Sequence, residues 1–372
     1  MSGAVTVLAF SLLTEDARVL KQVRLLAQDY QVTTVGYGPA PPGASEHYRI
    51  PDELVAWHKD RRALILRRYQ QVQTTNPVIA HLRQVLPRGR ADVVVANDAD
   101  TVPLAFWLRP RGGVHVDLHE YAPRQDEESW RWRTFVAPYY RWLCRTYVAR
   151  AGSVTTVGQG LAREYRREFG IHAAVVENAT PYREAEPGPV GRPIRLVHSG
   201  NARRNRNLEL MIEAVEAADA DVSLDLYLMP NDPTYLAQLR TRARDSLRVR
   251  VHDPVPYAEL VQTIAAYDVG VFVLPPVNFN YLWTLPNKFF DFIQARLGII
   301  VGPSPQMADL VRQHDLGAVT EDFTAASLRE ILERLSPESV RRWKQAAHRL
   351  APQVSAEKRL DGWRDAVAAR LR

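Results

Sequence analysis

The chain has 372 residues, a formal net charge of +6 and a single cysteine, Cys144. One cysteine excludes a framework of disulfide bonds within the chain and also a cysteine metal cluster. The length suits two domains, each large enough for its own core. No apolar run approaches the roughly 18 residues of a membrane-spanning helix. Because no basic segment precedes the first apolar run, the apolar stretch within residues 1–20 is interpreted as a buried first strand and not as a signal peptide, and we expect a cytoplasmic protein.

Short apolar runs alternate with helical segments along the whole chain, which predicts an α/β protein with parallel sheets and helices on both faces. The first half opens with a strand at 5–10, a helix at about 16–29 and a strand at 32–37. Its further strands are expected at 92–98, 113–120, 153–157 and 173–178. The second half repeats the plan, with strands expected at 194–200, 223–230, 249–255, 269–276, 298–303 and 317–321.

Residues 180–193 separate the two halves, because they are rich in Pro, Gly and charge and show no apolar periodicity. We therefore predict two doubly wound Rossmann-like domains, 1–180 and 194–350, that face a cleft. Residues 351–372 are expected to form a C-terminal helix that packs back on the first domain. Ligands of such sheets bind beyond the carboxyl ends of the strands.

The stretch LPNKFFDFIQARLGIIVG (285–302) predicts a phosphate site on a helix. Thr284 can cap this helix, and Pro286 fits its first turn. A helix N-terminus attracts phosphate through its N–H groups and its dipole, and Lys288 adds a positive charge there. Asp291, one turn later, can accept two hydrogen bonds from a ribose diol. An ordinary amphipathic helix with a solvated polar face is the alternative interpretation.

This stretch resembles the small-Leu-Pro-Asn-Lys-x-x-Glu-Tyr segment of family-4 type glycosyltransferases, also described as glycosyl transferases group 1. Other stretches are similar to segments of that family in the same order: EDARVLKQVRLLAQDYQVTTVGY (15–37), VDLHEYAP (116–123), GSVTTVGQGLAREY (152–165) and LVHSGNARRNRNLELMIEAV (196–215).

The resemblance implies a GT-B fold, with an acceptor-side first domain and a nucleotide-sugar donor domain second. It implies transfer of a sugar from a nucleotide-sugar to an acceptor hydroxyl, with retention of anomeric configuration and without a metal or other cofactor. The expected acceptor is a sugar, a lipid-linked molecule or a small molecule in glycan, glycolipid or natural-product biosynthesis. A catalytically silent GT-B subunit and a sugar-nucleotide epimerase of the same fold remain alternatives.

The resemblance also implies the donor site. Backbone N–H groups near Ser199 and Gly200 face a phosphate, while Arg206 and Lys288 neutralise the diphosphate. Thr284, Leu285, Asn287 and Asn201 complete the phosphate side. Asp291 is expected at the ribose, and the loop 252–255, with Val255, at the base. Trp283 stands where many relatives use a Glu for the donor sugar. Asn278, Asn280 or Tyr281 are alternative sugar contacts, and a less hydroxylated sugar that stacks on Trp283 is a further alternative.

In the first domain, the resemblance places His119 near the donor sugar as a hydrogen-bond donor and a catalytic residue. A buried structural histidine is the alternative interpretation. Asp117 is expected to point back into the domain. Asp16 and Arg18 would lie on the acceptor side, although Asp16 is also suited to cap the following helix.

Two basic stretches contain interleaved aromatic residues, WHKDRRALILRRYQQ (57–71) and WRWRTFVAPYYRWLCRTYVAR (130–150). Such helices can lie in a membrane interface. They can equally bury an apolar stripe and leave their Arg head groups in water. Peripheral membrane contact is therefore a hypothesis at this point. No nucleic-acid-reading motif accompanies the charge, so we expect no nucleic-acid partner.

Overall fold

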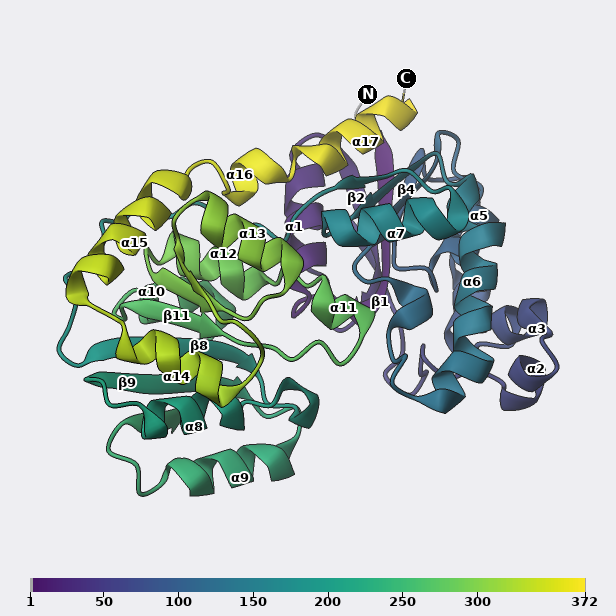
Figure 1. The fold of residues 1–372 in the computed structure, drawn as a ribbon. Coiled ribbons are helices and arrows are strands. Elements are labelled where there is room, and N and C mark those ends of the chain that lie inside the picture. The colour runs from purple at the N-terminus through teal and green to yellow at the C-terminus, as the bar shows by residue number, and fades with distance from the viewer. Residues whose placement is uncertain (1–2, 372) are drawn as a thin grey trace. The chain divides into compact units, whose positions relative to one another are not determined.

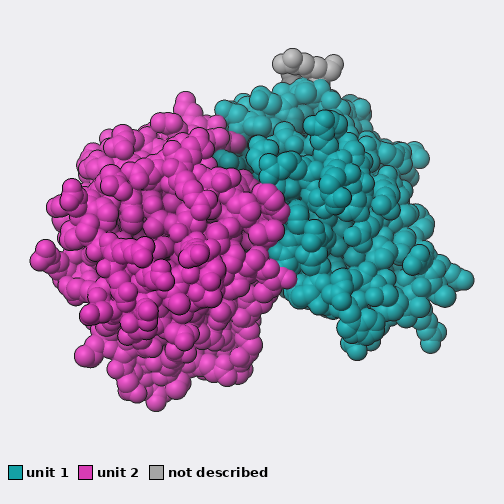
Figure 2. All heavy atoms as spheres, viewed as in Figure 1, with its two compact units in different colours: residues 1–177, 278–280, 360–372 teal, residues 178–277, 281–359 magenta. Residues whose placement is uncertain are grey.

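The computed structural model describes residues 3–371 and divides into two compact units (Figure 2). Unit 1 consists of the chain up to residue 177, residues 278–280 and the chain from residue 360. Unit 2 consists of residues 178–277 and 281–359. Each unit is built on its own sheet, and each is described separately below.

Unit 1 contains a seven-stranded sheet in the order β3-β2-β1-β4-β5-β6-β7, and all its neighbouring strands are parallel. Its strands are β1 (Ala4–Leu12), β2 (Gln31–Tyr37), β3 (Glu46–Arg49), β4 (Val93–Asn97), β5 (Gly113–Leu118), β6 (Ser153–Thr156) and β7 (Ala173–Val175). Its helices are α1 (Ala17–Leu26), α2 (Arg61–Ile65), α3 (Tyr69–Thr74), α4 (Pro77–Val85), α5 (Val102–Trp107), α6 (Ala137–Thr146), α7 (Gln159–Phe169) and α17 (Asp361–Leu371), with short helical turns η1 (Ala122–Arg124), η2 (Trp132–Val136) and η3 (Val148–Arg150).

The helix α17, drawn in yellow, returns to unit 1 beside the strands of the first half (Figure 1). Its Val367 belongs to a buried cluster with Val5 and Val7 of β1 and Val19 of α1. Trp363 is 1% exposed, and the Arg18 guanidinium lies over its ring, 4.7 Å from the ring centroid. The last helix of the chain therefore completes the core that the first strand and first helix begin.

Unit 2 contains a six-stranded parallel sheet in the order β10-β9-β8-β11-β12-β13. Its strands are β8 (Ile194–Asn201), β9 (Val222–Met229), β10 (Val249–His252), β11 (Val269–Phe272), β12 (Gly298–Val301) and β13 (Gly317–Val319). Its helices are α8 (Glu209–Ala217), α9 (Pro233–Ala243), α10 (Tyr257–Ile264), α12 (Asn287–Gln294), α13 (Pro305–Gln313), α14 (Ala325–Glu333), α15 (Pro337–Leu350) and α16 (Ala356–Arg359), with a short turn η4 (Arg204–Arg206). A four-residue helix, α11 (Phe279–Leu282), begins in the part of the chain that belongs to unit 1.

The alternation of side chains along β11 shows how this sheet is covered on both faces. Val269 and Val271 belong to a buried cluster that includes residues of α8 and α14. Between them, Gly270 faces the Phe292 ring of α12, so close that a Cβ atom there would lie 2.4 Å from the ring. Both units are thus doubly wound parallel sheets, which confirms the predicted α/β fold class.

Strand order reverses between β1 and β4 in unit 1 and between β8 and β11 in unit 2. In open parallel sheets, ligands bind at the carboxyl ends of the strands on either side of such a reversal. The residues that follow β1 and β4 in unit 1, and β8 and β11 in unit 2, therefore define where each unit can hold a ligand.

Residues 178–193 form no helix or strand, as their Pro and Gly content predicts. They are nevertheless attached to the core of unit 2. The Thr180 hydroxyl donates to Asp291 Oδ1 at 2.6 Å, and the backbone N–H of Arg183 donates to Gln294 Oε1 at 3.2 Å. The Pro and Gly content of this segment predicted that it forms no helix or strand, but it could not predict these two hydrogen bonds to unit 2.

Candidate functional site

In unit 2, three predicted donor residues meet at the end of β8. Gly200 has φ +149°, a conformation that side-chain-bearing residues rarely adopt. A Cβ atom on it would lie 2.5 Å from Lys288 Nζ and 3.5 Å from Arg206 Nη1. Glycine is therefore required where the backbone passes two cationic side chains. The sequence predicted this convergence of Gly200, Arg206 and Lys288.

Lys288 lies in the first turn of α12 and is 8% exposed. Its Nζ atom is 3.4 Å from His198 Nε2 and 4.4 Å from the centroid of the Phe272 ring. The Nδ1 atom of His198 is 2.9 Å from the Val271 carbonyl oxygen, so it carries the proton and Nε2 accepts from Lys288. Burial, together with Lys288, holds the pKa of His198 well below its usual value. The sequence analysis missed His198, although it directly precedes Ser199.

Arg206 ends the turn η4, and its buried Nε atom has no hydrogen-bond partner. Within residues 3–371, neither Arg206 nor Lys288 forms an ion pair with a carboxylate. Burial lowers the pKa of Lys288 well below its usual value, and Arg206 lowers it further, while Asp291 acts in the opposite direction. Two adjacent cations without a counter-ion form an electrostatically incomplete site, which an anion would complete.

The helix α12 begins differently from the prediction. It starts at Asn287 with Pro286 as the preceding cap residue and no side-chain cap, so the capping role predicted for Thr284 is wrong. All residues from Lys288 to Gln294 are buried, which excludes the alternative of a solvated polar face. The Asn287 side-chain oxygen is buried and has no hydrogen-bond partner, so the first turn of α12 carries an unsatisfied acceptor beside Lys288.

The ribose-binding role of Asp291 stays a prediction, and the structure gives this side chain a second role. This carboxylate is 1% exposed and accepts a hydrogen bond from Thr180. Asp291 acts here as an attachment point for the segment 178–193.

The remaining predicted donor residues lie around the same sheet edge or in nearby loops. Ser199 and Leu285 are buried, at 4% and 2% exposure. Thr284 and Asn201 are half-buried, and Asn201 pairs with Met229 in the ladder between β8 and β9. Val255 is half-buried in the loop that follows β10. The roles of these residues in ligand binding stay predictions.

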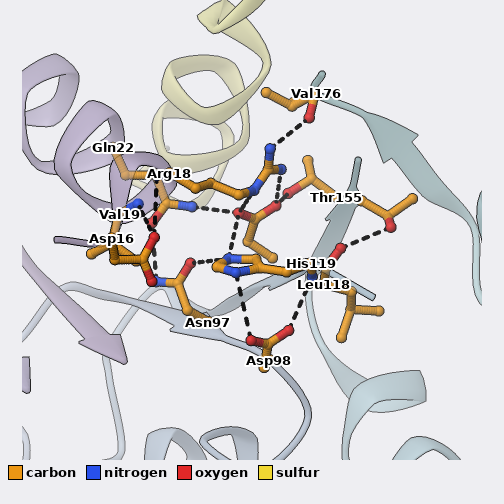
Figure 3. Close-up of polar contacts among 12 residues, drawn as sticks. Asp16, Arg18, Val19, Gln22, Asn97, Asp98, Leu118, His119, Thr155 and Val176 are labelled. Carbon is orange, nitrogen blue, oxygen red and sulfur yellow. Dashed lines mark hydrogen bonds and ion pairs between the residues drawn. The ribbon is translucent and has the colours of Figure 1, made fainter. Parts of the chain in front are cut away.

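In unit 1, His119 directly follows β5 and is held by side chains from two strand ends (Figure 3). Its Nε2 atom donates to Asn97 Oδ1 at 3.0 Å and lies 3.5 Å from Asp117 Oδ2, while Nδ1 lies 3.5 Å from Asp98 Oδ2. Burial opposes the charged form, but Asp98 and Asp117 outweigh it and raise the pKa of His119 to about 9. His119 is therefore a cation at neutral pH, with its ring 20% exposed.

Arg18 and Asp16 lie in different environments, although the prediction placed both on the acceptor side. Arg18 is 5% exposed and donates to both Asp117 oxygens at 2.7 Å, with a further bond to the Val176 carbonyl oxygen at 2.8 Å. Gln22 also donates to Asp117 at 2.6 Å. Arg18 and His119 hold the pKa of Asp117 well below its usual range even though burial opposes ionisation. This confirms the inward orientation of Asp117, and it makes Arg18 a positioning residue behind His119 instead of a contact for the acceptor.

Asp16 caps α1, because its Oδ1 accepts from the backbone N–H groups of Arg18 and Val19 at 3.1 Å. It also lines a cavity of about 1300 Å³ within unit 1. His119 and Asp98 line the same cavity, together with Asp100 and the aromatic residues Trp57, Trp132 and Tyr140. Carboxylates beside aromatic rings offer the hydrogen bonds and stacking surfaces that a carbohydrate or similar polyol uses.

Residues 278–280 belong to unit 1, and the side chains of Asn278 and Asn280, which were alternative contacts for the donor sugar, bind backbone groups of that unit. The Asn280 side chain accepts from the Tyr121 N–H at 2.7 Å and donates to the Tyr121 carbonyl at 3.3 Å. Asn278 donates to the Gln125 carbonyl at 3.1 Å. Both amide groups are thus used to hold the chain against the loop that follows β5.

The described residues contain no helix long and apolar enough to cross a membrane. No protein-family model matches the chain, and no curated protein sequence matches it. Solved structures do match it in fold. HepE of Anabaena, in a complex with UDP and glucose, has a TM-score of 0.74 at 12% identity and covers 99% of this chain and 100% of its own. Sucrose-phosphate synthase from Thermosynechococcus elongatus has a TM-score of 0.71 at 12% identity, with the same coverage.

A third similar structure, the UDP-forming α,α-trehalose-phosphate synthase from Burkholderia vietnamiensis, has a TM-score of 0.66 at 13% identity and covers 100% of this chain and 99% of its own. These likenesses extend over both units and over both strand-order reversals. The chain therefore has the GT-B fold, as the resemblance of its motifs predicted.

Proposed function

We propose that this protein is a glycosyltransferase that moves a sugar from a nucleotide-sugar to an acceptor hydroxyl. The observation that carries the proposal is the meeting of Lys288 and Arg206 at Gly200, at the strand-order reversal of unit 2. Both cations lack a carboxylate partner among the described residues, and a diphosphate supplies the missing negative charge. The GT-B fold supports this assignment.

The chemical role of these groups follows from where charge develops. As the bond between the sugar and the diphosphate breaks, negative charge grows on the departing phosphate oxygen. Preorganised cations and backbone N–H groups stabilise that charge without a reorganisation step. In unit 2 those groups are Lys288, Arg206 and the N–H groups near Gly200. His119, a cation with a raised pKa, is the proposed donor of a hydrogen bond to the transferred sugar.

A uridine nucleotide is the first donor to test, because the similar structures include one with bound UDP and glucose and one enzyme named as UDP-forming. We propose that no metal or other cofactor is needed, since two side-chain cations take the place that a divalent ion would have at the diphosphate. Activity in EDTA within about twofold of the untreated enzyme is expected, and loss of activity that added Mg²⁺ or Mn²⁺ restores would contradict this.

For the stereochemical course we propose retention, as in the glycosyltransferases that the motifs resemble. The departing phosphate then accepts the proton of the acceptor hydroxyl, so no side-chain nucleophile is needed. Proton NMR of the first product formed decides the point, because the anomeric coupling constant distinguishes retention from inversion. The acceptor itself is proposed to occupy the cavity of unit 1 beside Asp16 and Asp98.

Removal of each cation tests the donor site. Lys288→Ala and Arg206→Ala are each expected to lower the transfer rate by about 10²–10³, the usual loss for one preorganised group at a developing charge. Arg204→Ala is the matched control, because it removes the same charge from the same turn, but its guanidinium is bonded to Gln238 at 2.8 Å and lies over Tyr235. Donor hydrolysis and transfer by all three variants are measured by release of UDP. Rates within about threefold of wild type in both test variants would overturn the diphosphate assignment.

A further inference from the structure

The two basic aromatic stretches of the sequence come together on unit 1. Helix α2 contacts the π-helical turn η2, and Tyr69 of α3 lies 5.9 Å from Tyr139 of α6 between ring centroids. Lys59, which precedes α2, lies over the Tyr140 ring at 5.3 Å. Some of the aromatic side chains, such as Tyr69, Tyr139 and Tyr140, therefore pack between these helices. The remaining aromatic and aliphatic side chains stay outside this packing.

Helix α2 presents a mixed apolar and basic face to solvent. Ala63 and Leu64 are buried at 1% and 7% exposure, so they form the packed side of the helix. On the opposite side Ile65 is 59% exposed and Leu66 is 61% exposed. Trp57, which precedes this helix in the chain, and Trp130, which precedes η2, are exposed by 76% and 58%. Soluble proteins seldom expose several large apolar side chains on adjoining segments without a partner.

Arginine side chains surround these apolar groups. We define the α2–η2 face as Trp57, Arg61, Arg62, Ile65, Leu66, Arg67, Arg68, Trp130, Arg131 and Arg133, all of them exposed. Within the described part of the chain, none of the four Arg residues of α2 and its flank (Arg61, Arg62, Arg67, Arg68) forms an ion pair. Asp126 and Glu128 are exposed acidic residues in the segment before η2, so the α2–η2 face keeps a clear excess of positive charge.

We propose that the α2–η2 face docks on an anionic lipid bilayer. Exposed Trp, Ile and Leu side chains enter the interface between head groups and acyl chains, while the surrounding Arg side chains bind the anionic head groups. Nucleic acid would use the charge but leave the four apolar groups in water. Trp57, Arg61 and Arg62 also line the cavity of unit 1, so docking brings the rim of that cavity to the membrane surface. The proposal depends on the surface alone and does not require the donor to be known.

Co-sedimentation with vesicles tests the proposal on the full chain. One set of vesicles contains phosphatidylcholine alone, and the other contains about 30% phosphatidylglycerol. We expect binding to the anionic vesicles at least about tenfold stronger than to the neutral ones, and a loss of about tenfold between about 0.1 M and 0.5 M NaCl. Equal binding to both vesicle types, or no binding to either, would overturn the proposal.

Two double variants separate the contributions, and neither touches the cavity lining. Ile65→Ser with Leu66→Ser removes two of the four exposed apolar side chains without a change of charge, and Arg67→Glu with Arg68→Glu reverses two charges; each is expected to weaken vesicle binding at least about tenfold. The matched control is Leu247→Asp with Arg244→Glu, on exposed positions of unit 2 where Leu247 is 97% exposed.

Binding that survives in both test variants, or that falls equally in the control, would contradict the α2–η2 face as the docking surface. Sedimentation velocity without vesicles provides a further outcome. Dimers that disappear in Ile65→Ser with Leu66→Ser would assign the face to a second copy of the chain and would also overturn the proposal. UDP binding, measured on the same preparations, shows whether the donor site is intact.

Discussion

At the scale of single residues, the most informative feature is a pair of cations that the protein itself does not neutralise. Lys288 is buried, Arg206 has a buried Nε without a partner, and the neutral His198 offers Lys288 only an acceptor nitrogen. An uncompensated charge in a protected position is destabilising, so such an arrangement is expected where a ligand supplies the opposite charge. The lowered pKa of Lys288 is the measurable consequence.

This pKa predicts how UDP affinity changes with pH. In the absence of ligand, Lys288 loses its proton at a lower pH than an ordinary lysine, while a bound diphosphate favours the protonated form. Binding is therefore coupled to proton uptake, and affinity should fall as pH rises from the lowered pKa of Lys288 in the free protein toward the ordinary pKa of lysine, a range in which the diphosphate stays ionised. Calorimetry in buffers with different ionisation enthalpies measures the proton uptake directly.

Lys288→Arg provides the control for this prediction, because a guanidinium stays protonated throughout that pH range. The variant should bind UDP without proton uptake and with a flat pH dependence. Proton uptake that is unchanged in Lys288→Arg would assign the effect to another group and remove the argument for Lys288.

At the scale of elements, the short helix α11 shows how a side chain can replace backbone pairing. The two hydrogen bonds between Asn280 and the Tyr121 backbone copy those of a peptide group. Next to them, the backbone N–H of Phe279 donates to Glu127 at 2.7 Å, and the Phe279 ring lies 5.3 Å from the Tyr121 ring. Tyr121 is fully buried, so its backbone groups would have few other partners.

Asn280→Ala should therefore lower the free energy of unfolding of unit 1 by about 1–3 kcal/mol, the usual result of leaving buried backbone groups unpaired. Asn280→Asp keeps the acceptor and loses the donor, so an intermediate effect is expected. Thermal unfolding and hydrogen exchange of residues 119–127 measure the change. Asn205→Ala is the control, since its exposed side chain forms no hydrogen bond among the described residues. Exchange in 119–127 that stays at the wild-type rate would contradict this role of Asn280.

At the scale of the whole molecule, the two units contain different electrostatic arrangements. Unit 1 pairs its buried Arg18 with Asp117 and keeps His119 charged between carboxylates. Unit 2 leaves Lys288 and Arg206 without carboxylate partners in the described chain. A nucleotide diphosphate should therefore be bound by unit 2. The cavity of unit 1, where we expect the acceptor, is lined by carboxylates and also by Lys59, Arg61, Arg62 and His119.

UDP should accordingly protect unit 2 from hydrogen exchange. We expect the strongest protection at 199–206 and 284–289, and weaker protection in the loop 252–255 if the base lies there. A saturating ligand at about 100 times its Kd stabilises the protein that binds it by about 2.7 kcal/mol, which is enough to slow exchange in those segments clearly. The Lys288→Ala variant, at the same UDP concentration, should lose most of this protection. Protection confined to residues 3–177 would contradict the assignment of the donor to unit 2.

The sequence by itself determined the fold class and predicted which residues meet at the end of β8, because these depend on local pattern. Alternating strands and helices, the segment rich in Pro and Gly, and the capping position of Asp16 are all properties of neighbouring residues. The sequence also indicated Gly200, Arg206 and Lys288, since each follows or precedes a predictable element at the carboxyl edge of a sheet.

Only the tertiary structure decided which partners these residues have. Spacing along one helix placed Asp291 on a polar face, but the Thr180 hydroxyl, 111 positions away in the chain, takes up one of its carboxylate oxygens and keeps it in the core. His198 acquired a role because Val271 and Lys288 lie beside it, and Asn280 because Tyr121 does. Burial and pairing depend on contacts between distant segments, and such contacts form only when the chain is packed, so local pattern cannot reveal them.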